Sequence, residues 1–486
     1  MSGRWTRPRH FDFNLVVIGA GTAGLIGALV AVKAGAKVML VEARQMGGDC
    51  LNTGCVPSKA LIHAARLVSQ ARSAERMGLL GPTGPADAEA ALRYVRASIA
   101  AVAPHDSAER YKGFGIDVRH GHARIASPWT VEVDGTVVST RAIILATGAE
   151  PAVPPIPGLA DTGFLTSETL WNLERIPRRL LILGGGPIGC ELSQAFARLG
   201  STVTILQQGE HLLEREDDDV AALVQQRLTE DGVTVLTGTK AIAADCHDGK
   251  RKMLAERAGK QLHLEFDTLL IAVGRKPRTQ GFGLEELGIR LGARGTVETD
   301  AYLQTLHPSI YACGDVAGPW QFTHAASHQA WHATFNALFG SLHRIRPDPG
   351  FMPAVTFTEP EIARIGLNER DAKHQNVPHE VTRHELRELD RAIVDDAREG
   401  FVKLLTVPGR DRILGATIVA PRAGEMLGEF ALAMRSGIGL KKLFGMVHAY
   451  PTYIEANRDA AGEWRRKHAP EKLLRWLERY HAWRRG

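Results

Sequence analysis

The side chains of this sequence best suited to chemistry are a close pair of cysteines, Cys50 and Cys55, in the stretch GGDCLNTGCVPSK. Four residues separate them, a spacing that one helical turn brings within reach of a disulfide. The remaining cysteines, Cys190, Cys246 and Cys313, are scattered singly, unlike the disulfide framework of a small secreted domain. The pair therefore predicts redox chemistry, with a structural disulfide or two buried thiols as the alternatives.

A helix is expected to begin beside Cys55. Pro57 and Ser58 suit its first turn, and KALIHAARLVSQAR continues the helical pattern. Cys55 would then face the positive end of the helix dipole, which favours a thiolate.

Length and composition place the cysteine pair in a large α/β protein. A chain of 486 residues predicts about three domains, and 44% hydrophobic residues with 50 glycines fit tight phosphate-binding turns. The net charge of +5 indicates no nucleic-acid partner. The apolar runs are shorter than the ~20 residues of a membrane span, and MSGRWTRPRH lacks a secretory signal. We therefore expect a cytoplasmic protein.

A dinucleotide-binding pattern directly precedes the cysteines. A buried strand at 13–18 runs into GAGTAG and an apolar helix, and a second strand at 37–41 ends in Glu42, where an acid usually binds a ribose hydroxyl. Glycines at this spacing let the backbone approach a pyrophosphate at the helix N-terminus. The predicted contacts are Gly19, Gly21, Gly24 and Glu42. A tight turn without a ligand is the alternative.

The pattern occurs a second time, after a proline-rich connection. The first copy closes with a strand at 141–145 followed by ATG, and PAVPPIPG then marks a domain boundary. A strand at 180–183 leads into GGGPIG, and the next strand is followed by Gln207. Two copies predict two bound dinucleotides, the second of them at Gly184, Gly186 and Gly189.

The identity of the second dinucleotide depends on Gln207. NAD sites usually place an acid at this position and NADP sites an arginine. An uncharged glutamine can hydrogen-bond a 2′-hydroxyl, whereas a 2′-phosphate favours positive charge. We therefore expect NADH, while the nearby Arg215 keeps NADPH open.

The rest of the chain contains one further candidate contact and a separate domain. The strand in SIYACGD ends at Asp315, whose carboxylate can accept a hydrogen bond from a sugar or ribityl hydroxyl, or cap the strand. Residues 350–470 lack nucleotide-binding glycines and predict an α+β unit. His324 and His328 have the spacing of metal ligands on a helix, but no third ligand is evident, so we predict no metal site.

Taken together, the motifs resemble the class I pyridine nucleotide-disulphide oxidoreductases, the family of glutathione reductase, dihydrolipoamide dehydrogenase and mercuric reductase. They run in family order from about Asn14 to Glu455: GAGTAG, GGDCLNTGCVPSK, ATG, GGGPIGCE, AVGRKP, ACGDVAG, FTEPEIARIG and HAYPTYIE. The resemblance implies an α/β fold with two Rossmann-like dinucleotide-binding domains and a C-terminal α+β dimerisation domain. The predicted boundaries are an FAD-binding domain at 1–156, an NAD(P)-binding domain at 157–282, a central segment returning to the FAD domain at 283–349, an interface domain at 350–463 and a tail at 464–486.

The resemblance also implies how the site works. Cys55 would be the thiol nearer the flavin and Cys50 the interchange thiol nearer the substrate, while Lys59 and Glu191 would pair beside flavin N5. A hydride would pass from NAD(P)H to the flavin, and the electrons would pass through the Cys50–Cys55 disulfide to an acceptor. FAD would be bound by the first glycine set with Glu42, Gly148 and Asp315, and NAD(P)H by the second glycine set with Gln207.

One residue departs from the pattern of the disulphide reductases. In those homodimers a histidine before Pro-Thr enters the partner subunit's active site, held by a glutamate. Here that position is Tyr450, with the matching Glu455 intact. An unperturbed tyrosine titrates near ~10, so it is a poor group for protonating a leaving thiolate. His448 lies two residues earlier, a displacement that usually redirects a side chain.

The tyrosine resembles mercuric reductase, whose acceptor is a soft metal ion that thiolates bind well and that needs no proton. The vicinal cysteine pair at the end of those enzymes and their GMTCxxC domain are not found in this sequence. We predict an FAD-dependent NAD(P)H oxidoreductase that reduces Hg(II) or another soft metal ion or electrophile. Dihydrolipoamide dehydrogenase and NAD(P)H:quinone reductase activities are the alternatives.

The last residues, 464–486, are basic and carry apolar side chains at helical spacing. We expect a helix packed on the dimer surface, with a weak membrane-surface contact as the alternative. The apolar positions are Leu473, Leu474, Trp476, Leu477, Tyr480 and Trp483.

Overall fold

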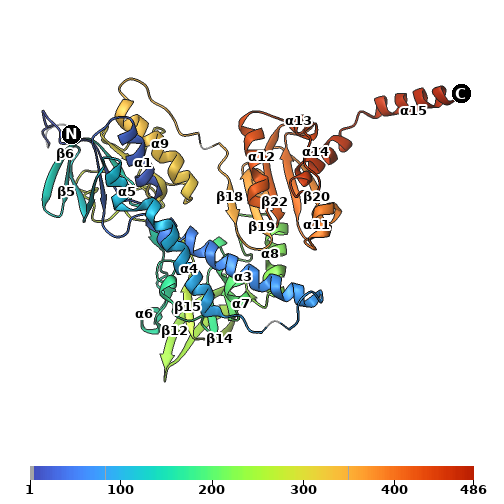
Figure 1. The fold of residues 1–486 in the computed structure, drawn as a ribbon, viewed down its shortest axis with the longest axis horizontal. Coiled ribbons are helices and arrows are strands. Elements are labelled where there is room, and N and C mark those ends of the chain that lie inside the picture. Colours follow the sequence, from blue (N-terminus) through green and yellow to red (C-terminus); the bar gives the residue numbers. More distant parts are fainter. Residues whose placement is uncertain (1–4, 83, 349) are drawn as a thin grey trace. The chain divides into compact units, whose positions relative to one another are not determined.

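The computed structural model describes residues 5–82, 84–348 and 350–486. The chain divides into two compact units, which are described separately. The first unit comprises Met1–Glu210 and Asp231–Asp348, and the second comprises His211–Glu230 and Pro349–Gly486. Figure 1 labels many of the elements of both units.

The first sheet carries the N-terminal glycine pattern. Its strands follow the order β3-β2-β1-β6-β5-β4, and β17 also pairs with β6. The strands are β1 (Phe13–Ile18), β2 (Val38–Glu42), β3 (Asp117–His120), β4 (Ala123–Ser127), β5 (Thr130–Val133), β6 (Thr136–Leu145) and β17 (Ile310–Ala312). Pairing along β3, β2, β1, β6 and β17 is parallel, and Ile18 lies opposite both Val41 and Leu145. The loops that follow β1, β2 and β6 therefore meet at one edge of the sheet.

Helices pack on this sheet because its central strands are apolar on both faces. Helix α1 (Thr22–Lys33) follows β1 and lies against α9 (Thr323–Phe339), which comes from the far end of the first unit. Leu15, Leu40 and Ile144 from the sheet meet Ala28 and Ala330 from these helices in one core. The small residues of α1 allow this close packing.

The chain between β2 and β3 is helical and contains the cysteine pair. Its elements are α2 (Gly48–Asn52), α3 (Cys55–Arg76), α4 (Ala88–Val102), the 3-10 turn η1 (Ala103–Asp106) and α5 (Ala108–Gly113). Asp87 caps α4 by accepting a hydrogen bond from the Ala90 amide at 2.9 Å. Helices α3 and α4 pack against each other.

A second parallel sheet repeats the arrangement of the first. Its order is β11-β10-β9-β15-β8, formed by β8 (Leu165–Thr166), β9 (Arg179–Leu183), β10 (Thr202–Leu206), β11 (Thr234–Leu236) and β15 (Thr268–Ile271). Leu183 lies opposite Leu206 and Ile271, as Ile18 lies opposite Val41 and Leu145 in the first sheet. Helix α7 (Pro187–Arg198) follows β9 and begins with a proline, which is favourable in a first helical turn.

Smaller elements complete the first unit. The antiparallel sheet β12-β13-β14 covers the second sheet, and β7 pairs with β16 at the connections that enter and leave it. These elements are β7 (Ala149–Pro151), α6 (Leu159–Thr162), η2 (Leu170–Asn172), β12 (Thr239–His247), β13 (Lys250–Arg257), β14 (Lys260–Phe266), β16 (Arg275–Pro277) and η3 (Gly314–Val316).

The second unit is built on an antiparallel sheet of order β18-β19-β22-β21-β20. Phe401 on β21, Phe430 on α12 and Trp464 on α14 are fully buried. The elements are β18 (Ala354–Thr356), β19 (Glu361–Gly366), α10 (Glu369–His374), β20 (Glu380–Glu385), η4 (Leu386–Glu388), α11 (Asp390–Val394), β21 (Phe401–Thr406), β22 (Ile413–Ala420), α12 (Ala423–Arg435), α13 (Leu440–Phe444), α14 (Glu455–Lys467) and α15 (Glu471–Arg485).

A buried lysine explains why α8 (Asp218–Glu230) belongs to the second unit. The ammonium of Lys403 on β21 lies 2.8 Å from Asp217, 2.7 Å from Asp219 and 3.0 Å from Glu369. A buried ammonium needs such partners, because leaving the charge unpaired away from water is costly. The lysine therefore fixes the start of α8 to the sheet.

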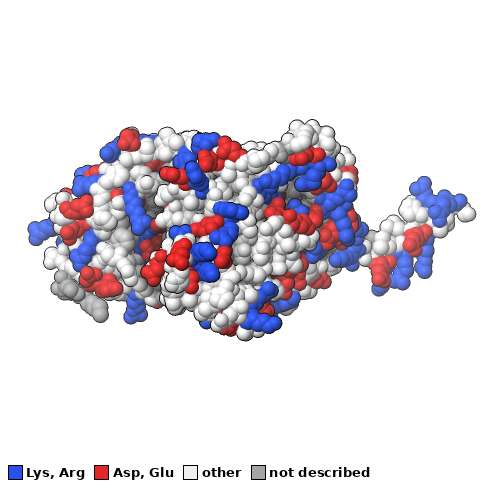
Figure 2. Space-filling model, turned by 90° about the horizontal axis from the view of Figure 1, so that it is seen from below, with Lys and Arg blue, Asp and Glu red and all other residues white. Residues whose placement is uncertain are grey.

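The surface carries charges of both signs. On the face that Figure 2 shows, Lys and Arg side chains are interspersed with Asp and Glu. Trp464, where the sequence places the start of the tail, is 1% exposed and belongs to the core, whereas α15 contains no buried residue. Among the described residues, no helix combines the length and the apolar character needed to cross a membrane.

Candidate active site

The two cysteines lie on either side of a tight turn between two helices. Cys50 is in the middle of α2 and Cys55 is the first residue of α3, so the pair does not share one continuous helix. Gly54 makes the turn possible, because a Cβ there would lie 2.9 Å from the Asp49 carbonyl oxygen. The predicted helix after Cys55 is present, and it begins at Cys55 itself.

The turn with the cysteines is fastened to the first glycine loop. The Gly47 amide donates to the Ala20 carbonyl at 2.9 Å. Gly48 has a φ of +59°, and a Cβ there would lie 2.5 Å from the Gly21 Cα, so only glycine fits this backbone-to-backbone contact. The side-chain amide of Asn52 donates a hydrogen bond to the Gly48 carbonyl at 2.9 Å. These contacts place the thiols beside the predicted dinucleotide loop.

The environments of the two thiols make Cys55 the stronger acid. Both are free thiols that hydrogen-bond each other. Stabilisation by the Cys50 thiol, by the Thr323 hydroxyl at 3.5 Å and by the Lys59 ammonium lowers the pKa of Cys55 to about 6. The hydrogen bond with Cys55, and secondly burial, raise the pKa of Cys50 far above its usual range. At neutral pH the dithiol therefore holds a thiolate at Cys55 and a thiol at Cys50.

Lys59 joins the cysteine-bearing helix to the second nucleotide pattern. Its Nζ lies 2.7 Å from Glu191 Oε2 on α7, and the Glu191 side chain is 6% exposed. The pair predicted from the sequence is thus present, one helical turn after Cys55. It provides a positive charge beside the thiolate and neutralises a buried carboxylate.

The first glycine loop has the shape that a bound FAD pyrophosphate requires. Gly19 has a φ of +101°, and a Cβ on Gly24 would lie 1.7 Å from the Gly19 carbonyl oxygen. Helix α1 begins directly after Gly21 with its amides at the loop, which favours an anion. Glu42 accepts a hydrogen bond from the Ala20 amide at 2.6 Å. The chain brings the glycines and the acid together, so the residues fit the group.

The second loop repeats this geometry with a neutral side chain. A Cβ on Gly189 would lie 1.9 Å from the Gly184 carbonyl oxygen, as in the first loop. Gln207 Oε1 accepts from the Gly185 amide at 2.7 Å, which is the role that Glu42 plays in the first loop. Helix α7 then starts directly after Gly186. This loop fits a second dinucleotide, and recognition of its ribose by Gln207 stays a prediction.

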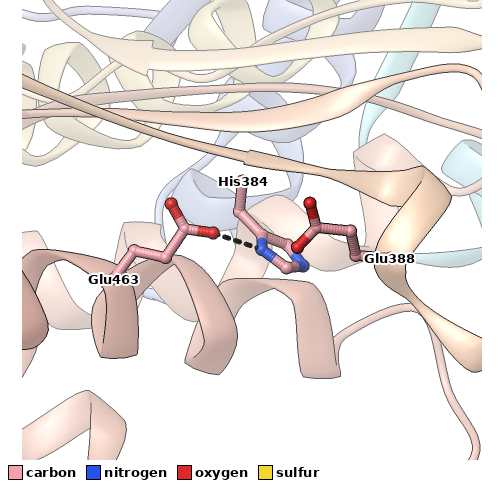
Figure 3. A group of neighbouring side chains, drawn as sticks. All are labelled: His384, Glu388 and Glu463. Carbon is pink, nitrogen blue, oxygen red and sulfur yellow. Dashed lines mark hydrogen bonds and ion pairs between the residues drawn. The ribbon is translucent and has the colours of Figure 1, made fainter.

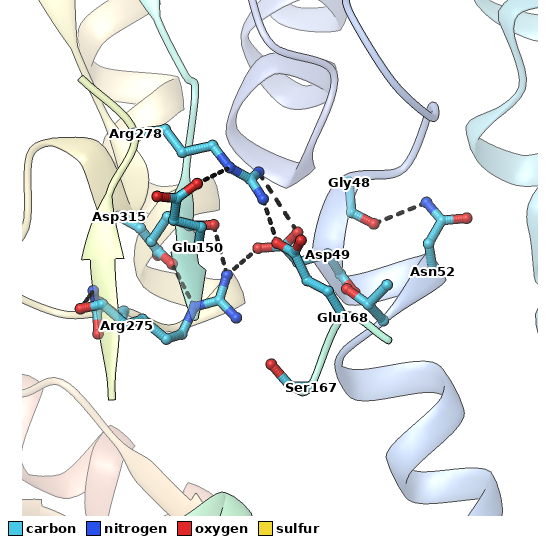
Figure 4. Close-up of polar contacts among 12 residues, drawn as sticks. Gly48, Asp49, Asn52, Glu150, Ser167, Glu168, Arg275, Arg278 and Asp315 are labelled. Carbon is cyan, nitrogen blue, oxygen red and sulfur yellow. Dashed lines mark hydrogen bonds and ion pairs between the residues drawn. The ribbon is translucent and has the colours of Figure 1, made fainter. Parts of the chain in front are cut away.

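A cluster of charged residues beside Cys50 was not found from the sequence. Arg275 contacts the carboxylate of Asp49, the neighbour of Cys50, and also lies 3.9 Å from Asp315 (Figure 4). Arg278 contacts Glu168 and donates its backbone amide to the Gly148 carbonyl at 3.0 Å. Both arginines belong to the AVGRKPR stretch, whose basic residues were the available signal.

Asp315 and Gly148 lie at the edges of this cluster. Burial raises the pKa of Asp315 to about 6, although Arg275 opposes the shift. Gly148 has a φ of +70°, which favours glycine. Asp315 follows β17 and Gly148 follows β6, which are neighbouring strands of the first sheet. Both residues therefore lie at the same edge of the sheet as the first glycine loop.

Tyr450 lies in the second unit and is 70% exposed. Its hydroxyl donates to Asp390 Oδ2 at 2.9 Å, which raises the tyrosine's pKa. Glu455, the residue expected to hold the side chain at this position, instead accepts from the Thr452 amide at 2.9 Å at the start of α14. The tyrosine is therefore held by an aspartate that sequence reasoning did not identify.

His448 does not take the place of the missing histidine within this unit. Its side chain is 5% exposed, and its Nε2 lies 2.8 Å from Glu429 Oε1 on α12. Asn457 donates to the other oxygen of the same carboxylate at 2.9 Å. The imidazole is turned into the core and away from the surface that Tyr450 occupies.

The folds of both units and the paired thiols identify the class. Residues 13–330 match the model for "Pyridine nucleotide-disulphide oxidoreductase", and residues 352–461 match its "dimerisation domain". The chain belongs to the pyridine nucleotide-disulphide oxidoreductase family and is an FAD-dependent enzyme. The fold class and the family predicted from the sequence are confirmed.

Two kinds of relative stand out within the family. A mercuric reductase from Staphylococcus aureus is 33% identical over 453 residues, covering 93% of this chain and 82% of that protein. A dihydrolipoyl dehydrogenase from Thermus scotoductus is 35% identical over 462 residues, covering 92% of this chain and 96% of that protein. The similarity does not separate the two activities.

The fold is also similar to solved flavoprotein structures. The HOCl-induced flavoprotein disulfide reductase RclA from Escherichia coli aligns with a TM-score of 0.82 at 30% identity, covering 92% of this chain and 99% of that one. A Cu(II) complex of the same protein aligns with a TM-score of 0.81 at 29% identity, with coverages of 93% and 99%.

Proposed function

We propose that this enzyme uses NAD(P)H to reduce a soft metal ion, such as Hg(II), at the Cys50–Cys55 dithiol. When bound, FAD supplies two-electron hydride chemistry between the nicotinamide and the disulfide. The observation that carries the proposal is the combination of a low-pKa thiol pair with a tyrosine where the disulphide reductases have an acid-base histidine.

The thiol pair supports the binding of a thiophilic ion. Cys55 is a thiolate at neutral pH, and the less acidic Cys50 loses its proton when a soft cation takes its sulfur. Two thiolates would then hold the ion, and two electrons supplied by NAD(P)H through FAD would reduce Hg(II) to the neutral metal. Lys59 offsets the negative charge that accumulates beside the Cys55 sulfur.

The tyrosine favours an acceptor that needs no proton. The hydrogen bond to Asp390 raises the pKa of Tyr450 above its ordinary value, so the hydroxyl is a weaker acid than a free tyrosine. His448, the nearest histidine in the chain, is buried against Glu429. A thiolate that leaves from a disulfide substrate would therefore lack the proton donor that turnover requires.

The same proposal includes the assembly and the nucleotide. The dimerisation domain supports a homodimer. In it, Tyr450 of the partner subunit would reach the dithiol of each chain. Gln207 supports NADH as the preferred reductant, because it offers no positive charge for a 2′-phosphate. Cys50, Cys55, Lys59 and Glu191 are the residues proposed to act in the redox step.

An acceptor panel tests the proposal. FAD-loaded enzyme is assayed with NADH and Hg(II), lipoamide or a soluble quinone, comparing wild type with Tyr450→His and Tyr450→Phe. We expect turnover with Hg(II) and negligible turnover with lipoamide in wild type, and a gain of lipoamide turnover of about tenfold or more in Tyr450→His. Tyr450→Phe is the matched control, because it keeps the ring and removes the hydroxyl.

Two results would overturn the metal-ion proposal. Lipoamide turnover by wild type above its turnover with Hg(II) would favour the dihydrolipoamide dehydrogenase alternative. Quinone turnover that exceeds both would place this enzyme among the quinone reductases.

A further inference from the structure

A buried histidine in the second unit lies between two carboxylates. His384 is on β20, and its side chain is 6% exposed. Its Nδ1 lies 2.7 Å from Glu463 Oε1 on α14, and Figure 3 shows Glu388, from η4, on the other side of the ring. Suitable ligand atoms of these three residues all lie within 4.8 Å of one another.

The hydrogen bond to Glu463 determines which ring nitrogen carries the proton. An ionised carboxylate only accepts hydrogen bonds, so Nδ1 donates to Glu463. In the neutral ring the lone pair is then on Nε2. That atom is buried and has no hydrogen-bond partner among the residues that the structure describes.

The unpartnered nitrogen faces another acceptor. Glu388 lies on the Nε2 side of the ring, and a carboxylate has no proton to donate to a lone pair (Figure 3). Glu388 is exposed, whereas the Nε2 lone pair is buried, so this nitrogen needs a hydrogen-bond donor or a cation beside it. The neighbouring basic side chain, Arg466, approaches Glu463 Oε1 at 3.9 Å.

We propose that His384, Glu388 and Glu463 form a binding site for a divalent transition-metal ion, with Zn²⁺ as the best match. His384 Nε2 and the Glu388 carboxylate would be the direct ligands. Glu463 would orient the ring through Nδ1, which is the usual arrangement of a metal-bound histidine. Imidazole and carboxylate ligands favour such an ion over Ca²⁺ or Mg²⁺. The sequence alone predicted no metal site.

The site would act on structure and not on the redox step. It joins β20 and η4 to α14, which are distant in the sequence. His384 and Glu463 are 79 residues apart. Glu388 is two residues before Asp390, which holds the Tyr450 hydroxyl. A bound ion would therefore stabilise the segment that positions Tyr450. The metal site does not depend on which acceptor the enzyme reduces.

Metal binding to the full-length, FAD-loaded protein tests the site. Cys50→Ala/Cys55→Ala serves as the background, because the redox thiols would themselves bind Zn²⁺. After treatment with a chelator, Zn²⁺ is titrated by calorimetry and Co²⁺ by visible absorption. We expect one ion per chain with micromolar affinity, and an increase in Tm of about 5 °C at saturating Zn²⁺.

Variants then assign the ligands. His384→Gln and Glu388→Gln should weaken Zn²⁺ binding by at least about tenfold, and Glu463→Gln by about tenfold. The control is His468→Gln. His468 also lies beside a glutamate, with its Nε2 3.0 Å from Glu380, but among the described residues it belongs to no group of three possible metal ligands. Its affinity for Zn²⁺ should match that of the background.

The proposal fails if no stoichiometric binding occurs, or if His384→Gln binds Zn²⁺ as tightly as the background. It also fails if NMR shows both nitrogens of His384 protonated at neutral pH in the presence of saturating Zn²⁺. In that case a proton, and not a metal ion, is the cation between the ring and Glu388.

Discussion

Lys59 Nζ and Glu191 Oε2 are 2.7 Å apart, and their ion pair joins the helix that begins at Cys55 to the helix that begins at the second glycine loop. The carboxylate is almost fully buried, whereas the lysine is partly exposed. The pair therefore links the thiols and the two predicted dinucleotide loops mechanically and electrostatically.

Removing one partner of this pair should cost more than removing both. Lys59→Met leaves the buried Glu191 carboxylate without its closest cation, and we expect the free energy of unfolding to fall by about 2 kcal/mol. The double variant Lys59→Met/Glu191→Gln should recover part of this loss. Urea unfolding of the FAD-loaded proteins at pH 7 measures both effects. Equal costs for the single and double variants would contradict the importance of the ion pair.

The acidity of Cys55 predicts a pH dependence. Its pKa is lowered to about 6, so in the reduced enzyme the thiolate is present above this pH and is lost as the pH falls through it. Alkylation by iodoacetamide, assigned by mass spectrometry, should show a midpoint near 6 for Cys55. The midpoint should rise in Cys50→Ala, which removes the main stabilising hydrogen bond, and less in Thr323→Val. A midpoint at the ordinary thiol value in wild type would disprove this assignment.

Gln207 should control the choice of nucleotide. Gln207→Glu places a negative charge near the ribose 2′ position, so we expect kcat/KM for NADPH to fall about tenfold relative to NADH. Gln207→Arg should shift the ratio toward NADPH. Arg215→Ala provides the complementary test, because a selective loss of NADPH turnover would mean that Arg215 binds the 2′-phosphate. Steady-state kinetics with both nucleotides gives the ratios.

The C-terminal helix should be dispensable for electron transfer. No residue of α15 is buried, so ending the chain at Pro470 should leave NADH turnover within about twofold of wild type. Sedimentation with anionic vesicles and size-exclusion chromatography then distinguish the two roles considered for this segment. Loss of vesicle binding on truncation would support membrane contact, and loss of the dimer would support packing at the dimer surface.

The parts of the site that depend on local sequence could be predicted. The glycine loops follow buried strands and precede helices, so their spacing alone located Glu42 and Gln207, which both accept hydrogen bonds from loop amides. The helix after Cys55 was likewise predicted from its first turn. These features need only neighbouring residues, whose geometry the sequence pattern determines.

The contacts missed from the sequence join distant residues. Arg275 and Asp49 are 226 positions apart, and Tyr450 and Asp390 are 60 apart. The residue types carried no signal of such pairing, because arginines and aspartates are common on surfaces and many exposed pairs contribute little. The attachment of α8 to the second unit through the buried Lys403 could not be foreseen for the same reason.

The most direct test asks whether electrons leave through Cys50. Anaerobic titration of the FAD-loaded enzyme with NADH, followed by Hg(II), is carried out on wild type and Cys50→Ala. The account predicts that two-electron reduction of wild type gives a long-wavelength band from the Cys55 thiolate beside the flavin, and that Cys50→Ala loses Hg(II) turnover by at least about 100-fold. Undiminished turnover with Hg(II) or a quinone in Cys50→Ala would contradict it, because the dithiol would then lie off the main electron path.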